Sequence, residues 1–292
     1  MSALALLVLT VAGICVPLAT GDLTQAGEAV VVGASGETVP SKLPRLRMAL
    51  ATLRLGFTSE VPGTPTTPEL AAIRLEVSRN VAFQTAGLPS CPIADLYAKS
   101  SDARRRCAGS LIGHGTVISE VTLPGQAPMT IEGHLLAFYD LGEGQPRILA
   151  QVTSAGALPL TYVIPFTIEK TRGAYGTALY ADQMRRIAGI CLRGHPNCFS
   201  QPYTYKGIYG HISKFELTLG HQFAHARKKT SVVSADCPAR NGTSSTSFPL
   251  VKVNLTYPVD FSPPYPDAVV RSEVATRRCE VSAPRRVHRK RS

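Results

Sequence analysis

Alternation of apolar and polar residues is the main pattern along this chain, and it is first clear at Thr52. Leu53, Leu55 and Phe57 fall on one side of an extended segment, while Thr52 and Arg54 fall on the other. A period of two is typical of a half-buried β-strand. The competing prediction just upstream is a helix whose leucines share one face: Leu43, Leu46, Leu50 and Leu53.

Similar strand patterns recur along the rest of the chain, with turn residues between them. They cover residues 73–77, 117–123, 129–137, 148–152, 160–169, 177–181, 209–219, 231–235, 251–257 and 268–281. Pro124-Gly125 predicts a hairpin turn, and Pro165 suggests a sheet edge or a bulge. One short helix is predicted at residues 103–107, with Ser101 as its cap. The chain is therefore predicted to be mainly β, as an antiparallel sandwich-like domain of about ten short strands with one short helix.

The N-terminal residues predict export from the cytoplasm. Residues 3–16 are an uncharged apolar run, Pro17 breaks it, and Ala19-Thr20-Gly21 supplies small residues for cleavage. This is the arrangement of a signal peptide, although no Lys or Arg precedes the run. The run is shorter than a membrane-spanning helix, and no transmembrane span is predicted in the mature chain. We expect an extracellular or cell-surface protein, with a buried N-terminal helix as the alternative.

Composition changes divide the chain into further segments. We expect a signal peptide at 1–21, a flexible lead-in at 22–44, a single disulfide-stapled β domain at 45–282 and a basic tail at 283–292. The lead-in is rich in Gly, Ala and Thr and has little periodicity. Residues 183–206 are predicted to be an insertion between two strands of the β domain.

The cysteines agree with export. Six remain after removal of the signal peptide: Cys91, Cys107, Cys191, Cys198, Cys237 and Cys279. An even number in an exported chain predicts disulfide bonds. Six cysteines allow 15 pairings, and the nearest-neighbour scheme of 91–107, 191–198 and 237–279 is the one that we favour. A zinc site is the alternative, but the spacing of Cys191 and Cys198 lacks the tight knuckle that zinc sites use.

The net charge of +11 is concentrated in short clusters. The tail carries five basic residues, Arg285, Arg286, Arg289, Lys290 and Arg291. Other clusters are Arg104-Arg105-Arg106, Arg227-Lys228-Lys229 and Arg277-Arg278. Such a surface attracts anionic partners, so anionic cell-envelope polymers or lipid head groups are the partners that we consider. A solvated, mobile tail is the simpler alternative, and no nucleic-acid partner is expected of an exported protein.

Histidines are the first candidates for chemistry. His221 and His225 have the i, i+4 spacing of a helical metal-binding pair, but on a strand their rings would lie about 13 Å apart. His114 lies between two glycines, which can expose a ring in a cleft but more often mark a bulge or a tight bend. Neither a metal nor another cofactor is predicted.

Motifs of the common hydrolases are missing from the sequence. No G-x-S-x-G nucleophile motif is present, and an even number of cysteines argues against a free thiol nucleophile. Glu132, Asp140 and Glu143 cluster near one turn, but nothing in the sequence places a cleft between them. Catalytic residues can be dispersed in sequence, so these observations weaken the prediction of an enzyme without removing it.

An ordered set of short motifs covers about residues 50–281. It comprises Leu88-Pro89-x-Cys91, Arg104-x-x-Cys107, Leu111-Ile112-Gly113-x-Gly115, Gly133-x-Leu135-x-Ala137-Phe138, Tyr175-Gly176-Thr177, Phe215-x-Leu217-Thr218-Leu219, Ala235-x-Cys237-Pro238, Ser247-Phe248-Pro249-Leu250 and Cys279. In this order the motifs resemble a family of uncharacterised secreted proteins of actinobacteria. The resemblance implies export and the core cysteine pairs, marks the segment with Cys191 and Cys198 as an addition, and implies no activity.

Three function classes remain open from the sequence. The one that we favour is a non-enzymatic structural or binding domain of the cell surface or the extracellular space. The second is an extracellular hydrolase with a dispersed site that includes His114 and His134, and a histidine paired with a carboxylate in a concave pocket would favour it. The third is a binder of anionic envelope material through basic segments.

Overall fold

The computed structural model describes residues 30–62, 70–97, 100–122, 127–142, 144–154, 161–182, 184, 209–257 and 268–282. The predicted signal peptide, the basic tail, and the predicted insertion apart from Met184 lie outside these residues. The described part of the chain is mainly β, as the alternating pattern predicts.

The described elements are mostly strands, with one short α-helix and two 3-10 turns. They are β1 (Val31–Val39), β2 (Lys42–Leu43), β3 (Ala49–Glu60), β4 (Ala72–Ser78), β5 (Val81–Phe83), the 3-10 turn η1 (Ile93–Tyr97), α2 (Ser100–Arg106), the 3-10 turn η2 (Ala108–Ser110), β6 (Leu111–Thr122), β7 (Met129–Gly142), β8 (Gln145–Thr153), β9 (Thr161–Lys170), β10 (Tyr175–Ala181), β11 (Tyr209–Leu219), β12 (Gln222–His225), β13 (Lys228–Ser231), β14 (Val233–Ala235), β15 (Ser245–Tyr257) and β16 (Val269–Val281).

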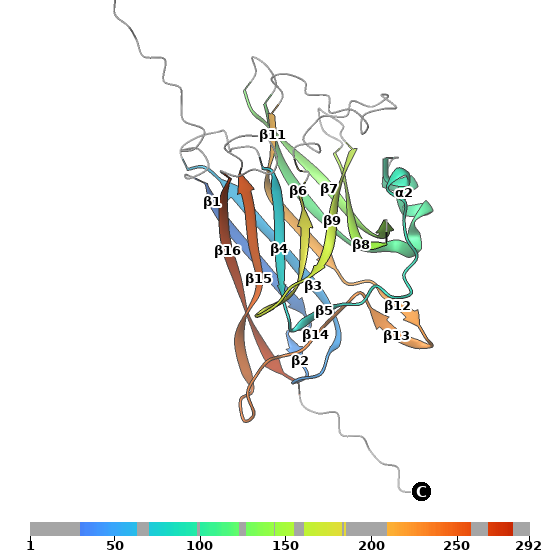
Figure 1. The fold of residues 1–292 in the computed structure, drawn as a ribbon, viewed down its shortest axis with the longest axis vertical. Helices are drawn as coiled ribbons and strands as arrows, with labels where there is room; N and C mark the ends of the chain where they lie inside the picture. Colours follow the sequence, from blue (N-terminus) through green and yellow to red (C-terminus); the bar gives the residue numbers. More distant parts are fainter. Residues whose placement is uncertain are drawn as a thin grey trace, which may run out of the picture.

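One large sheet contains fourteen of these strands, in the order β2-β16-β15-β4-β10-β9-β8-β7-β6-β11-β3-β14-β5, with β1 also paired to β3. All described pairs in it are antiparallel except β2 with β16, which is parallel. The sheet curls so that one face encloses the core (Figure 1). The predicted sandwich-like arrangement of about ten short strands is therefore wrong in its details, because long strands continue around a bend where a sandwich would separate into two sheets.

Curling brings β1 next to β16, although the described ladders join β1 only to β3. Glu37 on β1 lies 3.3 Å from the guanidinium of Arg277 on β16. Gly36 faces inward here, and a Cβ at this position would lie 3.1 Å from a methyl group of Val251 and 3.4 Å from the Cβ of Ala275. A small residue is needed because the two ends of the sheet approach closely across the core.

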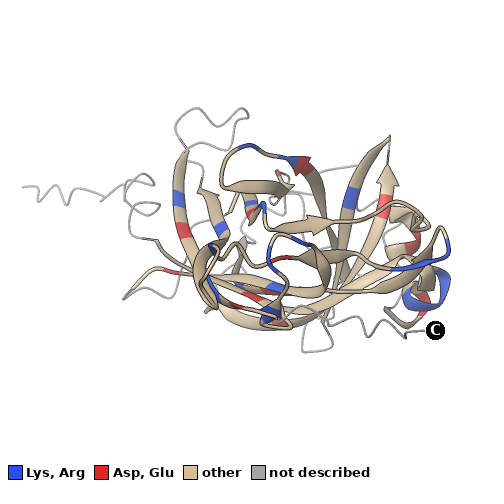
Figure 2. Ribbon diagram, turned by 90° about the horizontal axis from the view of Figure 1, so that it is seen from below, with Lys and Arg blue, Asp and Glu red and all other residues tan. Residues whose placement is uncertain are grey.

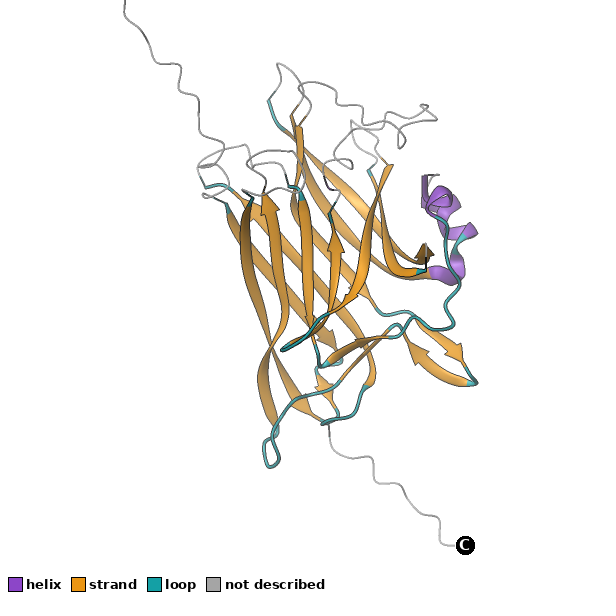
Figure 3. Cartoon of the chain, in the orientation of Figure 1, coloured by secondary structure: helices purple, strands orange, loops and turns teal. Residues whose placement is uncertain are grey.

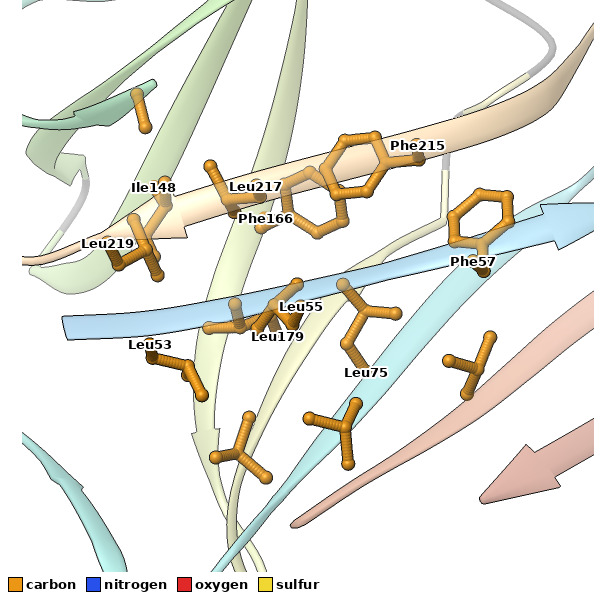
Figure 4. Close-up of a cluster of buried hydrophobic side chains, with 14 of the residues drawn as sticks. Leu53, Leu55, Phe57, Leu75, Ile148, Phe166, Leu179, Phe215, Leu217 and Leu219 are labelled. Atoms are coloured by element: carbon orange, nitrogen blue, oxygen red, sulfur yellow. The ribbon is translucent and has the colours of Figure 1, made fainter. Parts of the chain in front are cut away.

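The core is formed by the inward-facing residues of strands on opposite sides of the curl (Figure 4). Phe215 on β11 lies at its centre, with its ring 5.6 Å from the ring of Phe57 on β3 and 5.6 Å from that of Phe166 on β9. Leu55 and Leu75 are also fully or almost fully buried in this cluster. The predicted inward positions of the strand at Thr52 are thus confirmed.

A second, smaller cluster lies on the outer face of β7, β8 and β9. Leu136, Phe138, Leu149 and Val163 point outward there and are covered by η1 and α2. These two helical elements are the purple segments at one side of the sheet in Figure 3. The short helix predicted at residues 103–107 is present as Ser100–Arg106. It exists here because a seven-residue helix gains its stability from packing on the sheet.

The predicted flexible lead-in is wrong for its second half. Residues 31–39 form β1 and pair along their whole length with β3, while Lys42 and Leu43 pair with the end of β16. The competing helix through Leu43, Leu46, Leu50 and Leu53 is also wrong, because Leu50 and Leu53 lie on β3. Pro165 lies on an interior strand, opposite Leu149 on β8, but the β9–β10 ladder covers only residues 167–170, so Pro165 has no ladder partner on β10.

Candidate functional site

Antiparallel strands place alternate connections at the same end of a sheet. The β7–β8 turn and the segment that carries α2 lie to one side of the end that is formed in this way. Five other connections gather at the part of this end that is marked by β2, β14 and the β12–β13 hairpin, which is the lower end in Figure 1. They are residues 40–48, 79–80, 171–174, 220–232 and 236–244, all of them described by the structure. We call these five segments the basic end.

The basic end carries nine Lys and Arg residues: Lys42, Arg45, Arg47, Arg79, Arg172, Arg227, Lys228, Lys229 and Arg240. Its single carboxylate is Asp236, which is buried and accepts a hydrogen bond of 2.7 Å from the amide of Asn80. Lys42 pairs with Glu280 on the neighbouring strand, at 3.5 Å. The potential at this end is therefore strongly positive, and it attracts anions over about a Debye length.

The β12–β13 hairpin presents three of these cations. Ala226 and Arg227 both have left-handed backbone angles, with φ of 49° and 61°, which is the geometry of a two-residue type I′ turn. Arg227, Lys228 and Lys229 are exposed at this tip and form no ion pair with any described residue. The base of the hairpin is held by Phe223, which packs against the main core. The hairpin tip therefore projects three cations that are unpaired within the described part of the chain.

The cluster on α2 is different, although it has the same number of cations. Arg105 pairs with Asp102 at 2.9 Å and Arg106 with Asp95 at 3.3 Å, so two of its three charges are neutralised. Figure 2, seen from below, shows Lys and Arg segments at the side that carries both α2 and the hairpin. Arg104 alone remains without an acidic partner among the described residues. The structure thus separates two clusters that look equivalent in the sequence.

The predicted anion-binding tail residues Arg285, Arg286, Arg289, Lys290 and Arg291 lie outside the described residues. The tail nevertheless follows directly from the basic end. Ser282, the last described residue before it, donates its backbone amide to the carbonyl oxygen of Leu43 at 2.9 Å. Along the chain, the charges of the tail therefore begin within a few residues of the basic end.

His114 and His134 lie on the outer face of the sheet, and both are exposed. Thr116 is opposite His134 in the β6–β7 ladder. Thr116, Glu132 and His134 line a hollow of about 180 Å³, smaller than the roughly 300–1,000 Å³ of most small-molecule sites. Within the described residues, no hydrogen bond or ion pair joins either histidine to a carboxylate. The arrangement that would favour a hydrolase is not formed here.

The glycines beside His114 have a structural reason. A Cβ at Gly113 would collide with the carbonyl oxygen of Thr218, and one at Gly115 would collide with that of Glu216. Strands β6 and β11 therefore approach too closely for any side chain at these two positions. The sequence pattern around His114 reflects this approach and does not indicate a catalytic ring.

The other candidate residues do not assemble into a site either, and Glu143 lies outside the described residues. His221 stacks on Phe223 with ring centroids 6.3 Å apart and immediately precedes β12, while His225 ends this strand, so the two do not form a helical i, i+4 pair. Asp140 is bonded to Arg147 and accepts a hydrogen bond of 2.6 Å from Ser90. Nowhere in the described chain do three or more potential metal ligands come together.

The disulfide bonds Cys91–Cys107 and Cys237–Cys279 are both present, with Cα atoms 5.5 and 5.8 Å apart. This is the nearest-neighbour scheme as far as the structure describes it. The third predicted pair, Cys191 with Cys198, lies outside the described residues.

Sequence reasoning did not single out the contact between His211 and Glu120. Their side chains approach to 3.4 Å on β11 and β6. Burial lowers the pKa of His211 to about 4, and burial also raises the pKa of Glu120. The imidazole is therefore neutral at pH 7, and the contact is not an ion pair at that pH. A single histidine on a strand gives no sequence signal for such burial.

Comparisons with models of protein families, with curated proteins and with solved structures gave no match. The resemblance to secreted actinobacterial proteins therefore stays a prediction. No helix in the described chain is long and apolar enough to cross a membrane.

Proposed function

We propose that this chain is a non-enzymatic binding domain that acts outside the cytoplasm and attaches to anionic polymers of the cell envelope. The observation that carries the proposal is the basic end, whose five connections carry nine cations and one buried carboxylate. The disulfide bonds are compatible with an oxidising, extracellular location. A hydrolase has less support, because His134 lines only a small hollow and, among the described residues, neither His114 nor His134 is bonded to a carboxylate.

Binding by the basic end is electrostatic. The cations sit on five separate connections held at fixed positions by the sheet, so they offer a broad positive surface. Such a surface fits a repeating anion, in which several phosphate or carboxylate groups meet several cations at once. Each Lys or Arg near the charged partner contributes about 1 kcal/mol, and salt weakens the attachment.

The test compares the two clusters of three cations. Retention on immobilised poly(glycerol phosphate) is measured against salt concentration for the wild type, Arg227→Gln/Lys228→Gln/Lys229→Gln and Arg104→Gln/Arg105→Gln/Arg106→Gln. Both variants lose the same net charge, but only the first alters the basic end. We expect the hairpin variant to bind on the order of 10- to 100-fold more weakly, and the α2 variant to bind within a few-fold of the wild type. Equal weakening of both, or no binding by the wild type, would reject the proposal.

A further inference from the structure

Apolar side chains are exposed in the basic end and on the strand residues next to it. Val39, Leu46, Met48 and Leu50 are 41%, 78%, 41% and 38% exposed, and they make up half of the large exposed hydrophobic residues in the described chain. The others, Val31, Leu141, Val270 and Val274, lie elsewhere on the strands. Single exposed apolar residues are ordinary, but a group that is surrounded by cations indicates a binding surface.

Two of the four residues share one face of the sheet, and a third is next to them in the sequence. Val39 on β1 is opposite Thr52 on β3, so the two side chains point to the same side. Leu50 is two residues from Thr52 and points to that side as well. Met48, one further step of two along the chain, immediately precedes β3. Together with Leu46 we call them the apolar tip.

Leu46 is held in a conformation that leucine rarely adopts. Its φ is 52°, in the left-handed region, which is unfavourable for residues with a Cβ. The neighbouring contacts keep it there. The guanidinium of Arg45 donates to the side-chain oxygen of Asn241 at 3.1 Å and to the carbonyl of Thr243 at 2.7 Å. The amide of Cys237 donates to the carbonyl of Pro44 at 3.0 Å. A strained, anchored and largely exposed leucine indicates a functional position.

The surroundings of the apolar tip are cationic. Arg47 is exposed between Leu46 and Met48 in the sequence, and Arg240 is exposed on the adjacent segment that Arg45 holds. The hairpin tip lies at the same end of the molecule (Figure 1). A soluble polyanion would account for the cations but not for exposed leucine and methionine. A bilayer with anionic head groups accounts for both, because apolar side chains enter the head-group boundary while cations meet phosphates.

We infer that the basic end docks on a bilayer containing anionic lipids, with Leu46 and Met48 entering the interface. The inference rests on the proposed function in using the same cations, and it names a lipid surface as their partner. Attachment is peripheral and reversible, because four partly exposed side chains bury far less apolar area than a membrane-spanning segment.

The first experiment measures co-sedimentation with vesicles of phosphatidylcholine containing a minority of phosphatidylglycerol. The test variant is Leu46→Asn/Met48→Gln, in which asparagine tolerates the left-handed conformation and keeps the fold. The matched control is Val270→Thr/Val274→Thr, which removes two exposed apolar side chains from β16. We expect the test variant to partition about tenfold more weakly, the control to bind as the wild type does, and both to bind soluble poly(glycerol phosphate) normally.

The outcomes separate the two proposals. Unchanged vesicle binding by the test variant, or wild-type binding to the polymer but not to vesicles, overturns the inference and leaves the proposed function standing. Loss of both kinds of binding in the wild type overturns both. A wild-type dimer that the test variant converts to a monomer would assign the apolar tip to self-association and overturn the inference as well.

A second measurement does not depend on weakened binding. The chain has no tryptophan, so Leu46→Trp creates a single fluorescent reporter at the apolar tip. We expect its emission to shift to shorter wavelength on adding anionic vesicles and to be quenched by brominated lipid. An unshifted spectrum with bound protein would show that residue 46 stays in water, and would overturn the inference.

Discussion

The two described disulfide bonds join the same kind of residue but stabilise different parts of the molecule. Cys237 and Cys279 are both fully buried in the main core, next to the basic end. Cys91 and Cys107 belong to the smaller outer cluster, where they close the segment that covers β7, β8 and β9. The first bond is therefore part of the core that the sheet encloses. The second holds residues 91–107, which we call the cover, on the outer face of the sheet.

Backbone contacts sharpen this difference. Around Cys237–Cys279, Glu280 donates to the carbonyl of Ser41, at 3.1 Å, and Val281 donates to that of Ser244, at 2.8 Å. Segments from both ends of the described chain are thus tied together there. Around Cys91–Cys107, the backbone of Cys91 makes a single hydrogen bond to the described strands, from its amide to the carbonyl of Tyr139 at 3.0 Å. We expect loss of the first bond to affect the whole fold and loss of the second to act locally.

The largest effect is expected for Cys237→Ala/Cys279→Ala. The bond closes a separation of 42 residues, for which loop-closure entropy gives about 4 kcal/mol of stabilisation. Urea unfolding followed by circular dichroism measures the free energy of unfolding. We expect a single transition shifted to lower urea, because the affected segments belong to the main core. A loss smaller than that of the outer disulfide would reverse the comparison.

A smaller effect is expected for Cys91→Ala/Cys107→Ala. The separation is 16 residues, which corresponds to about 3 kcal/mol in the same treatment. Hydrogen exchange should rise in residues 91–110, while the strands around Phe215 stay protected. Increased exchange throughout β3 and β11 would show that the cover is needed for the whole sheet and would contradict the local role.

The smallest effect is expected for Ser90→Ala, which tests how the cover is held at one point. The hydroxyl of Ser90 donates to Asp140 at 2.6 Å and accepts from the amide of Leu141 at 3.0 Å. Asp140 keeps its bonds to Arg147, so the cost is about 1–2 kcal/mol. Thermal unfolding measures this cost, with Ser101→Ala on the exposed side of α2 as the control. An unchanged midpoint would mean that this contact does not hold the cover.

The sequence predicted those strands in which the residues of a single segment show which side faces the core. Leu53, Leu55 and Phe57 alternate because one side of β3 faces the core, and this is visible without any knowledge of neighbours. β1 could not be predicted in this way, because Gly33 and Gly36 interrupt its apolar pattern. Glycine is present at these positions because side chains of other strands approach closely. The curl of the sheet depends on which strands become neighbours, and that information is not contained in the period of any one segment.

The candidate site was predictable to a similar extent. The cationic clusters can be counted in the sequence. Whether their charges form ion pairs cannot be predicted from it, because the pairing with Asp95 and Asp102 depends on the packing of η1 and α2. Strand order decides that five connections reach the same end. In the sequence Leu46 appears only as one leucine of the competing helix, since an apolar residue with an exposed, left-handed conformation has no distinct sequence signal.

The direction of the strands determines how a docked molecule would be oriented relative to the surface. β3 begins at the basic end and runs for 12 residues, a span of roughly 40 Å at the usual rise per residue. With the basic end against a surface, Glu60 at the far end of β3 points outward into the surrounding fluid. Neighbouring copies would share this orientation, so a crowded layer of the protein would present one uniform outer face, formed by the opposite strand ends.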